Sequence, residues 1–173
     1  NKQMCGIAGV IDFNKNNRIH TLRKMNFSLK HRGPDDSGEW FSKTAYIAHR
    51  RLKIIDLSDR SKQPMTLNNR YVLTYNGEIY NYKELKKHLL NKYVFKSKGD
   101  TEVLLKLLHC YKEKALQKIE GMFAFALWDE KRKELFAARD PFGIKPFYFY
   151  KNKNVFYFAS EIKAFKAAGI KIK

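Results

Sequence analysis

The chain has 173 residues, of which 44% are hydrophobic and 14% aromatic, so it can bury a core and is not a disordered protein. Its formal net charge of +18 invites a nucleic-acid interpretation, but only 9 of the 35 basic residues are Arg and they are scattered, so we expect a solvated surface and no specific nucleic acid. The two cysteines form no disulfide framework or zinc motif. No apolar run is long enough for a membrane helix and no signal-peptide pattern begins the chain, so the expected location is cytoplasmic.

Cys5 stands directly before the first predicted strand, residues 6–11. Gly6 and Gly9 weaken this strand unless another group approaches its backbone, and a substrate beside the thiol could be that group. If Met4 were removed, Cys5 would carry both a thiol and a free α-amine, which is a nucleophile with its own base. The alternative is an ordinary buried cysteine.

Helical periodicity and turn residues divide the next part of the chain. The predicted helices are 18–30, 82–91 and 100–111, with a further turn around 116–119, and the predicted strands are 40–41, 45–48, 71–75 and 93–95.

The last third of the chain is a series of strands joined by short polar turns. The predicted strands are 123–128, 135–138, 147–150 and 155–158, followed by a helix that Ser160 caps and that ends at Ala168. Strand 123–128 is apolar on both faces, which indicates burial on both faces. The expected fold is therefore α+β: a four-layer αββα sandwich of two mainly antiparallel sheets flanked by helices.

Polar residues follow the predicted strand 71–75. Asn76-Gly77 is first of all a turn signal, but an Asn amide and a Gly backbone N–H at a strand end can also hold an oxyanion. Glu78 beside them could bind an ammonium group. Arg50 and Arg51 form either a solvated basic turn or a fork on a substrate carboxylate.

Asp100 begins the predicted helix 100–111. It is either the helix N-cap or a second anion for a substrate ammonium. One Arg, two acids and an oxyanion hole would recognise an amino acid whose side chain carries an acyl group. Two charged loops, 31–36 and 139–146, are each expected to hold an Arg–Asp pair that braces the loop, and Cys110 is expected in the core.

Seven motifs occur together and in one order, which is far more specific than any one of them. They are Cys5-Gly6-Ile7-Ala8-Gly9, His31-Arg32-Gly33-Pro34-Asp35, Arg51-Leu52-Lys53-Ile54-Ile55-Asp56, Tyr75-Asn76-Gly77-Glu78-Ile79-Tyr80-Asn81, Gly121-Met122-Phe123-Ala124-Phe125-Ala126, Arg139-Asp140-Pro141-Phe142-Gly143-Ile144-Lys145-Pro146 and Ser160-Glu161-Ile162-Lys163-Ala164. Over nearly the whole chain, this set resembles the class II glutamine amidotransferase domain of glutamine-hydrolysing asparagine synthetases.

The resemblance implies the fold of the N-terminal nucleophile (Ntn) hydrolases, in agreement with the αββα expectation. It implies that Cys5 attacks the side-chain amide of L-glutamine, with its own α-amine as base, while Asn76 and Gly77 hold the oxyanion. It implies no metal and no cofactor for this step. The implied substrate-binding residues are Arg51 for the α-carboxylate, Glu78 and Asp100 for the α-ammonium, and backbone near Ile54 and Ile55 for the pocket wall.

By the same resemblance, residues 5–173 form the amidotransferase domain and residues 1–4 are a leader or a cloning remnant, since as written they leave Cys5 without a free amine. The ammonia would pass to a C-terminal ATP-dependent asparagine synthetase domain, expected to be absent from this chain, to which ATP and Mg would belong. A homodimer is compatible with the resemblance. Two alternatives stay open: an inactive module that senses glutamine or docks to a synthetase, and a glutaminase domain that supplies a sugar or another acceptor.

Overall fold

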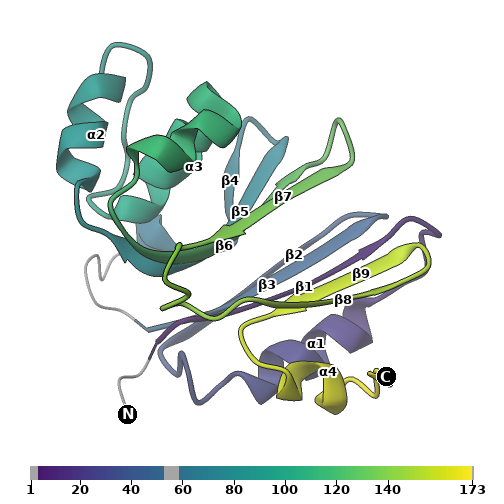
Figure 1. The fold of residues 1–173 in the computed structure, drawn as a ribbon. Helices are drawn as coiled ribbons and strands as arrows, with labels where there is room; N and C mark the ends of the chain where they lie inside the picture. Colours follow the sequence, from purple (N-terminus) through teal and green to yellow (C-terminus); the bar gives the residue numbers. More distant parts are fainter. Residues whose placement is uncertain (1–3, 53–58, 173) are drawn as a thin grey trace.

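The computed structural model describes residues 4–52 and 59–172. Two antiparallel sheets pack face to face, and helices cover the outer face of each (Figure 1). The four-layer αββα sandwich predicted from the sequence is therefore confirmed. In the described residues, no helix has the length and apolar character needed to cross a membrane.

The first sheet contains the N-terminal strand at its centre, in the order β2-β3-β1-β9-β8. Helices α1 and α4 lie on its outer face, below it in Figure 1. The elements of this half are β1 (Gly6–Asp12), α1 (Ile19–Ser28), β2 (Asp36–Phe41), β3 (Ala45–Arg51), β8 (Tyr148–Asn152), β9 (Val155–Ala159) and α4 (Lys163–Ala167).

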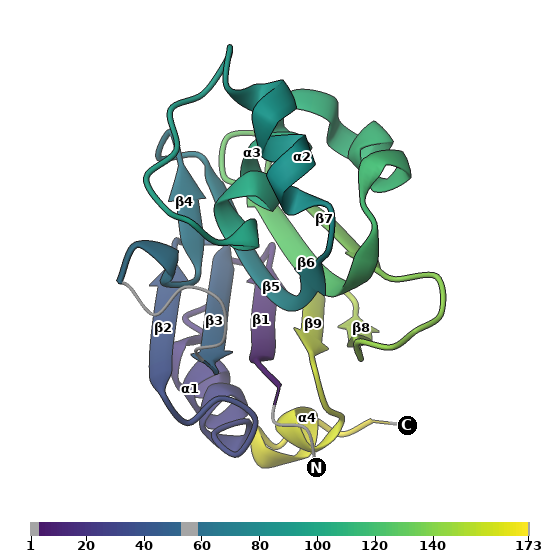
Figure 2. The ribbon, with the colours of Figure 1, turned by 90° about the vertical axis from the view of Figure 1, so that its left-hand side faces the viewer.

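The second sheet has the order β4-β5-β6-β7, and α2 and α3 cover its outer face (Figure 2). Its longest strands, β5 and β6, pair along their whole length. The elements of this half are η1 (Asp59–Ser61), β4 (Met65–Leu67), β5 (Tyr71–Ile79), α2 (Tyr82–Leu89), α3 (Asp100–Tyr111), η2 (Lys112–Lys118), β6 (Gly121–Asp129) and β7 (Glu134–Arg139).

Strand β6 shows how the layers are held together. Phe123 and Phe125 lie in the cluster that joins this sheet to α2 and α3, whereas Ala126 and Trp128 lie in the cluster between the two sheets. The alternation along one strand thus fills two apolar layers, as its two apolar faces predicted.

Three local predictions are wrong. Residues 93–95 form no strand, because side chains of α3 bind the backbone there: Lys106 Nζ donates to the Val94 carbonyl at 2.5 Å. Asn76-Gly77 is not a turn but part of β5, which continues to Ile79. Ser160 caps no helix, since α4 begins at Lys163 and the buried Ser160 hydroxyl accepts the Ile7 N–H at 2.9 Å.

The glycines of β1 accommodate core side chains, and not a substrate as predicted. A Cβ on Gly9 would lie 2.2 Å from the Phe158 ring, and one on Gly6 would lie 3.1 Å from Leu29 Cβ. Close approach to the backbone therefore occurs, but it serves packing.

Candidate active site

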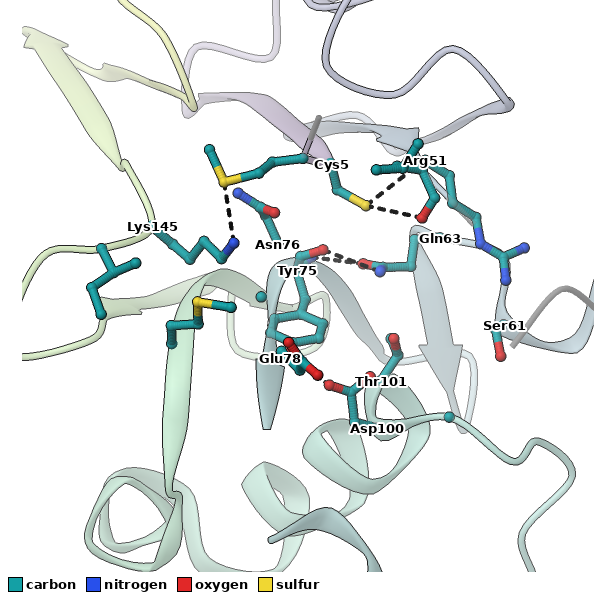
Figure 3. Close-up of a pocket in the computed structure, with 16 residues that line it drawn as sticks. Cys5, Arg51, Ser61, Gln63, Tyr75, Asn76, Glu78, Asp100, Thr101 and Lys145 are labelled. Atoms are coloured by element: carbon teal, nitrogen blue, oxygen red, sulfur yellow. Dashed lines mark hydrogen bonds between the residues drawn. The ribbon is translucent and has the colours of Figure 1, made fainter. Parts of the chain in front are cut away.

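One cavity of about 540 Å³ opens at the ends of the two sheets (Figure 3). Every predicted site residue that the structure describes lies on its wall: Cys5, Arg51, Asn76, Gly77, Glu78 and Asp100. Ile54 and Ile55 lie outside the described residues. Cys5 and Arg51 come from the first sheet, and the Asn-Gly-Glu run comes from the second, so the sandwich brings together residues far apart in sequence.

Cys5 stands immediately before β1, at the cavity wall. Its thiol Sγ accepts a hydrogen bond from Leu52 N–H at 3.3 Å and donates to the Leu52 carbonyl at 3.7 Å. Burial raises the pKa of the Cys5 thiol, against the Leu52 hydrogen bond and the positive charges of Arg51, Lys145 and Arg32. In this chain the thiol is therefore held predominantly protonated at neutral pH, and an efficient attack requires a base.

Asn76 presents an unused hydrogen-bond donor to the cavity. The β5 alternation directs the side chains of Asn76 and Glu78 to the face where Val72 joins the inter-sheet cluster and Thr74 bonds to β3. Asn76 is 2% exposed, and its Nδ2 has no hydrogen-bond partner in the described part of the chain. Since buried donors are normally paired, this one suits a ligand oxygen.

The Gly77 N–H points to the edge of β5 away from β6. Both backbone groups of Phe123, which opposes Gly77, bond to Asp140 instead. In an antiparallel pair such a position is non-hydrogen-bonded, so the Gly77 amide faces the opposite edge. A side chain there is excluded, because a Cβ would lie 2.3 Å from the Met122 carbonyl oxygen.

The two acids lie together across the cavity from the thiol (Figure 3). Asp100 Oδ2 accepts hydrogen bonds from the Tyr75 hydroxyl at 2.7 Å and the Ile79 N–H at 3.0 Å. Burial raises the pKa of Asp100, while these hydrogen bonds lower it. Gly99 is the N-cap of α3, so the capping role considered for Asp100 is wrong.

Arg51 ends β3 and is 6% exposed. Its position on the cavity wall makes it a buried cation facing the same space as the two acids. Opposite charges around one cavity suit a ligand that carries both a carboxylate and an ammonium group.

Two further residues of the cavity wall, Lys145 and Gln63, were not assigned to the site from the sequence. Lys145 is 7% exposed, and its Nζ donates to Met4 Sδ at 3.1 Å beside Cys5. Burial, followed by the positive charge of Arg32, lowers the pKa of Lys145. Gln63, from the polar loop before β4, binds the backbone of Tyr75. Gln63 belongs to none of the seven motifs, and Lys145 lies in a motif whose expected role was to brace a loop, so the fold is what places both on the cavity wall.

The two charged loops were predicted to be braced by Arg–Asp pairs, whereas the contacts of Arg32 and Arg139 within the described residues are different. Arg32 pairs with Glu161 at 3.0 Å, and its Nε donates to the Cys5 carbonyl at 3.0 Å. Arg139 donates to the Gly143 carbonyl. Asp140 accepts the backbone N–H groups of Phe123, Ile144 and Lys145, which fixes the loop that carries Lys145 into the cavity.

Cys110, expected in the core, is partly buried and packs against the cluster under α2 and α3. Among the residues that the structure describes, no three His, Cys, Asp or Glu side chains gather in a group that could hold a metal ion.

Fold and site together define a class of protein: an αββα domain in which a cysteine before a central strand faces a cavity lined by a buried Asn amide, a buried Arg and two acids. The sequence model of the glutamine amidotransferase domain matches residues 4–173, so the chain belongs to this family, in its class II branch.

Curated relatives extend the comparison. Asparagine synthetase (glutamine-hydrolysing) 3 of Bacillus subtilis is 42% identical over 170 residues, covering 95% of this chain and 28% of the relative. Putative asparagine synthetase 2 of Methanocaldococcus jannaschii is 38% identical, covering 95% and 35%. Amidase chry2 of Gibberella zeae is 36% identical, covering 96% and 27%. The chain thus spans about a third or less of these relatives.

A solved structure supports the fold. The glutamine phosphoribosylpyrophosphate amidotransferase of B. subtilis superimposes with a TM-score of 0.78 at 24% identity, over 95% of this chain and 44% of that chain.

Proposed function

We propose that this domain hydrolyses L-glutamine to L-glutamate and ammonia through a thioester on Cys5. The observation that carries the proposal is that Cys5 and Asn76 line the same cavity, and that the buried Asn76 Nδ2 has no partner in the part of the chain that the structure describes. A nucleophile and an oxyanion donor facing one space are the two requirements of acyl transfer.

The charged residues of the wall would orient the substrate. Arg51 binds the α-carboxylate of glutamine, and Glu78 with Asp100 binds the α-ammonium. The hydrogen bonds from Tyr75 and Ile79 help to keep Asp100 ionised against its burial. The side-chain amide then extends toward Cys5, across the cavity from the acids.

In the first chemical step, the α-amine of Cys5 takes the thiol proton and the sulfur attacks the amide carbon. The Asn76 amide and the Gly77 N–H hold the resulting oxyanion, each donor contributing roughly 3 kcal/mol by comparison with other oxyanion holes. The carbon–nitrogen bond breaks as the amine returns its proton, and ammonia leaves. Water then cleaves the thioester to give glutamate and the free thiol.

The proposal requires a form of the protein that begins at Cys5, because a peptide nitrogen cannot act as the base. Removal of residues 1–4 is therefore part of it. Removal of these residues would also free the Lys145 ammonium group, whose Nζ donates to the Met4 sulfur at 3.1 Å.

The ammonia is proposed to serve an ATP-dependent, Mg-requiring synthetase domain, with aspartate as acceptor. The B. subtilis relative is named as an asparagine synthetase and the M. jannaschii relative as a putative one, which supports aspartate as the acceptor. Exposed apolar side chains beside the cavity support a docked partner: Phe142 is 89% exposed, and Ile144, on the cavity wall, is 55% exposed.

The test compares glutamate release by protein that begins at Cys5, by the same protein with Cys5→Ala, and by the chain with its four leading residues. Only the first should release glutamate. Equal rates with and without the thiol would refute the hydrolysis. Calorimetric binding of glutamine without turnover by protein that begins at Cys5 would instead indicate a sensing module.

A further inference from the structure

The edge of β5 facing the cavity is bound by side chains where its neighbouring strand ends. Strand β4 pairs with β5 only as far as Leu73. At the next position on this edge, Tyr75 N–H donates to Gln63 Oε1 at 2.6 Å, and Gln63 Nε2 donates to the Tyr75 carbonyl at 3.1 Å. His49 Nε2 donates to the same carbonyl at 3.0 Å.

Gln63 is itself firmly held. It is 8% exposed, and its backbone packs on β2, where a Cβ on Gly38 would lie 1.9 Å from the Gln63 carbonyl oxygen. Because β2 belongs to the first sheet, the Gln63 side chain connects that sheet to the backbone of β5 in the second.

The next amide along this edge of β5 is the N–H of Gly77. Tyr75 is bound by Gln63, and the N–H of Ile79 is bound by Asp100 at 3.0 Å. Gly77 lies between them, with its N–H on the same edge. A full strand on this edge would have used the Gly77 N–H. The two side chains instead fix the backbone on both sides, and among the described residues that N–H has no partner.

We propose that Gln63 is a positioning residue for the oxyanion site. It fixes the peptide that joins Tyr75 to Asn76, so that Asn76 Nδ2 and Gly77 N–H point to one place in the cavity. Gln63 acts through the Tyr75 backbone, with which both its polar atoms are engaged. The inference rests on the proposed glutamine hydrolysis.

The first test is Gln63→Met in protein that begins at Cys5, which keeps the length of the side chain and removes both hydrogen bonds. Since a misplacement of about 1 Å can cost on the order of 100-fold in rate, we expect kcat to fall by about tenfold or more, with KM changed far less.

Asn81→Leu is the matched control. Asn81 makes the same kind of double contact outside the cavity, donating to the Lys118 carbonyl at 2.8 Å and accepting the Glu120 N–H at 3.1 Å. Its loss should lower stability, measured by urea unfolding, while leaving kcat near that of the parent. If both variants reduce kcat alike, Gln63 has only a structural role and the inference is wrong.

A binding measurement separates this inference from the proposed function. The Cys5 thiol adds to the aldehyde carbon of glutamate γ-semialdehyde and forms a tetrahedral adduct, whose oxygen needs the oxyanion donors. The product glutamate forms no such adduct and does not need them. Gln63→Met should weaken binding of the aldehyde by about the factor lost in kcat and leave glutamate binding nearly unchanged. Equal aldehyde affinity in parent and variant overturns the role of Gln63 even if the parent is active.

A parent that binds the aldehyde but releases no glutamate refutes the proposed function alone, and the Gln63 comparison still decides the inference. A parent that does neither refutes both. If Gln63→Met does not fold, Gln63→Glu, which keeps an acceptor for the Tyr75 N–H and loses the donor, provides the same comparison.

Discussion

His49 is a buried histidine whose protonation the fold opposes. It is 1% exposed, its Nε2 donates to the Tyr75 carbonyl, and its Nδ1 has no partner in the described residues. Burial, with the nearby charge of Arg51, lowers the pKa of His49 from 6.5 to about 4, against the Tyr75 hydrogen bond and Asp36. Between these pH values the unfolded chain binds a proton that the folded protein does not, so this residue makes stability fall as the pH falls.

The prediction is that His49→Gln, which retains a donor for Tyr75, reduces this loss of stability between pH 6.5 and pH 4 by about 3 kcal/mol. Urea unfolding at several pH values across this range measures it, with the wild-type protein as reference. His88→Gln is the control, because His88 is exposed and its replacement should leave the slope unchanged. Parallel pH curves for wild type and His49→Gln would contradict the prediction.

At the same scale, local chemistry identified the residues that have a motif around them. Asn76, Gly77 and Glu78 follow the predicted strand 71–75 and Cys5 precedes another, but local chemistry left each of them with a structural alternative, and only the resemblance to the amidotransferase family put them in one site. The role of Gln63 could not be anticipated, because it depends on the loop before β4 lying beside Tyr75, and no sequence motif indicates that contact. Lys145 likewise reaches the cavity only because Asp140 binds the backbone of its loop.

Strand β1 shows how an element is adapted to its neighbours. Gly9 lies against the ring of Phe158, and a Cβ added to Gly9 would be 2.2 Å from the nearest ring atoms. Gly9→Ala should destabilise the protein by about 1–3 kcal/mol through overpacking. The double variant with Phe158→Leu should lose less unfolding free energy than the sum of the two single variants. Urea unfolding of the parent, the two single variants and the double variant measures this difference. Gly169→Ala, with nothing within 4 Å, should be additive with Phe158→Leu; additivity for Gly9→Ala as well would contradict the packing explanation.

Elements with a strong period were predicted, and elements fixed by tertiary contacts were not. Helices α1 and α3 and strands β6 and β7 follow from their apolar spacing. The irregular segment at 93–95 has the composition of a strand, but Lys106 binds its backbone. Asn-Gly reads as a turn locally, yet β5 passes straight through it because β6 pairs along all nine of its residues. A tertiary contact outweighed local preference at 93–95, and strand pairing outweighed it at Asn-Gly.

For the whole molecule, the site depends on two sheets held at a fixed separation. The first sheet supplies the Cys5 thiol and the buried Arg51, and the second supplies the amides of Asn76 and Gly77. The layer between them contains large, fully buried rings, including Trp128 and Phe158. Close packing of this layer sets the distance between the Cys5 thiol and the two amides, because a filled interior resists small displacements.

The net charge of +18 also acts on the molecule as a whole. Self-repulsion opposes the compact state and is screened by salt, whereas exposed ion pairs such as Arg23–Glu39 contribute little. The urea midpoint should therefore rise between low and physiological NaCl, by about 1 kcal/mol in unfolding free energy if several like-charge contacts of a few tenths each are relieved. Urea adds no ionic strength, so NaCl alone sets the screening.

Lys83→Glu provides the matched variant, since Lys83 and Lys87 are exposed one turn apart on α2. It should be more stable than the parent at low salt and respond less to NaCl, because it turns a like-charge pair into an attractive one. A midpoint that falls with added NaCl in the parent would mean that attractive pairs dominate, and the charge argument would be wrong.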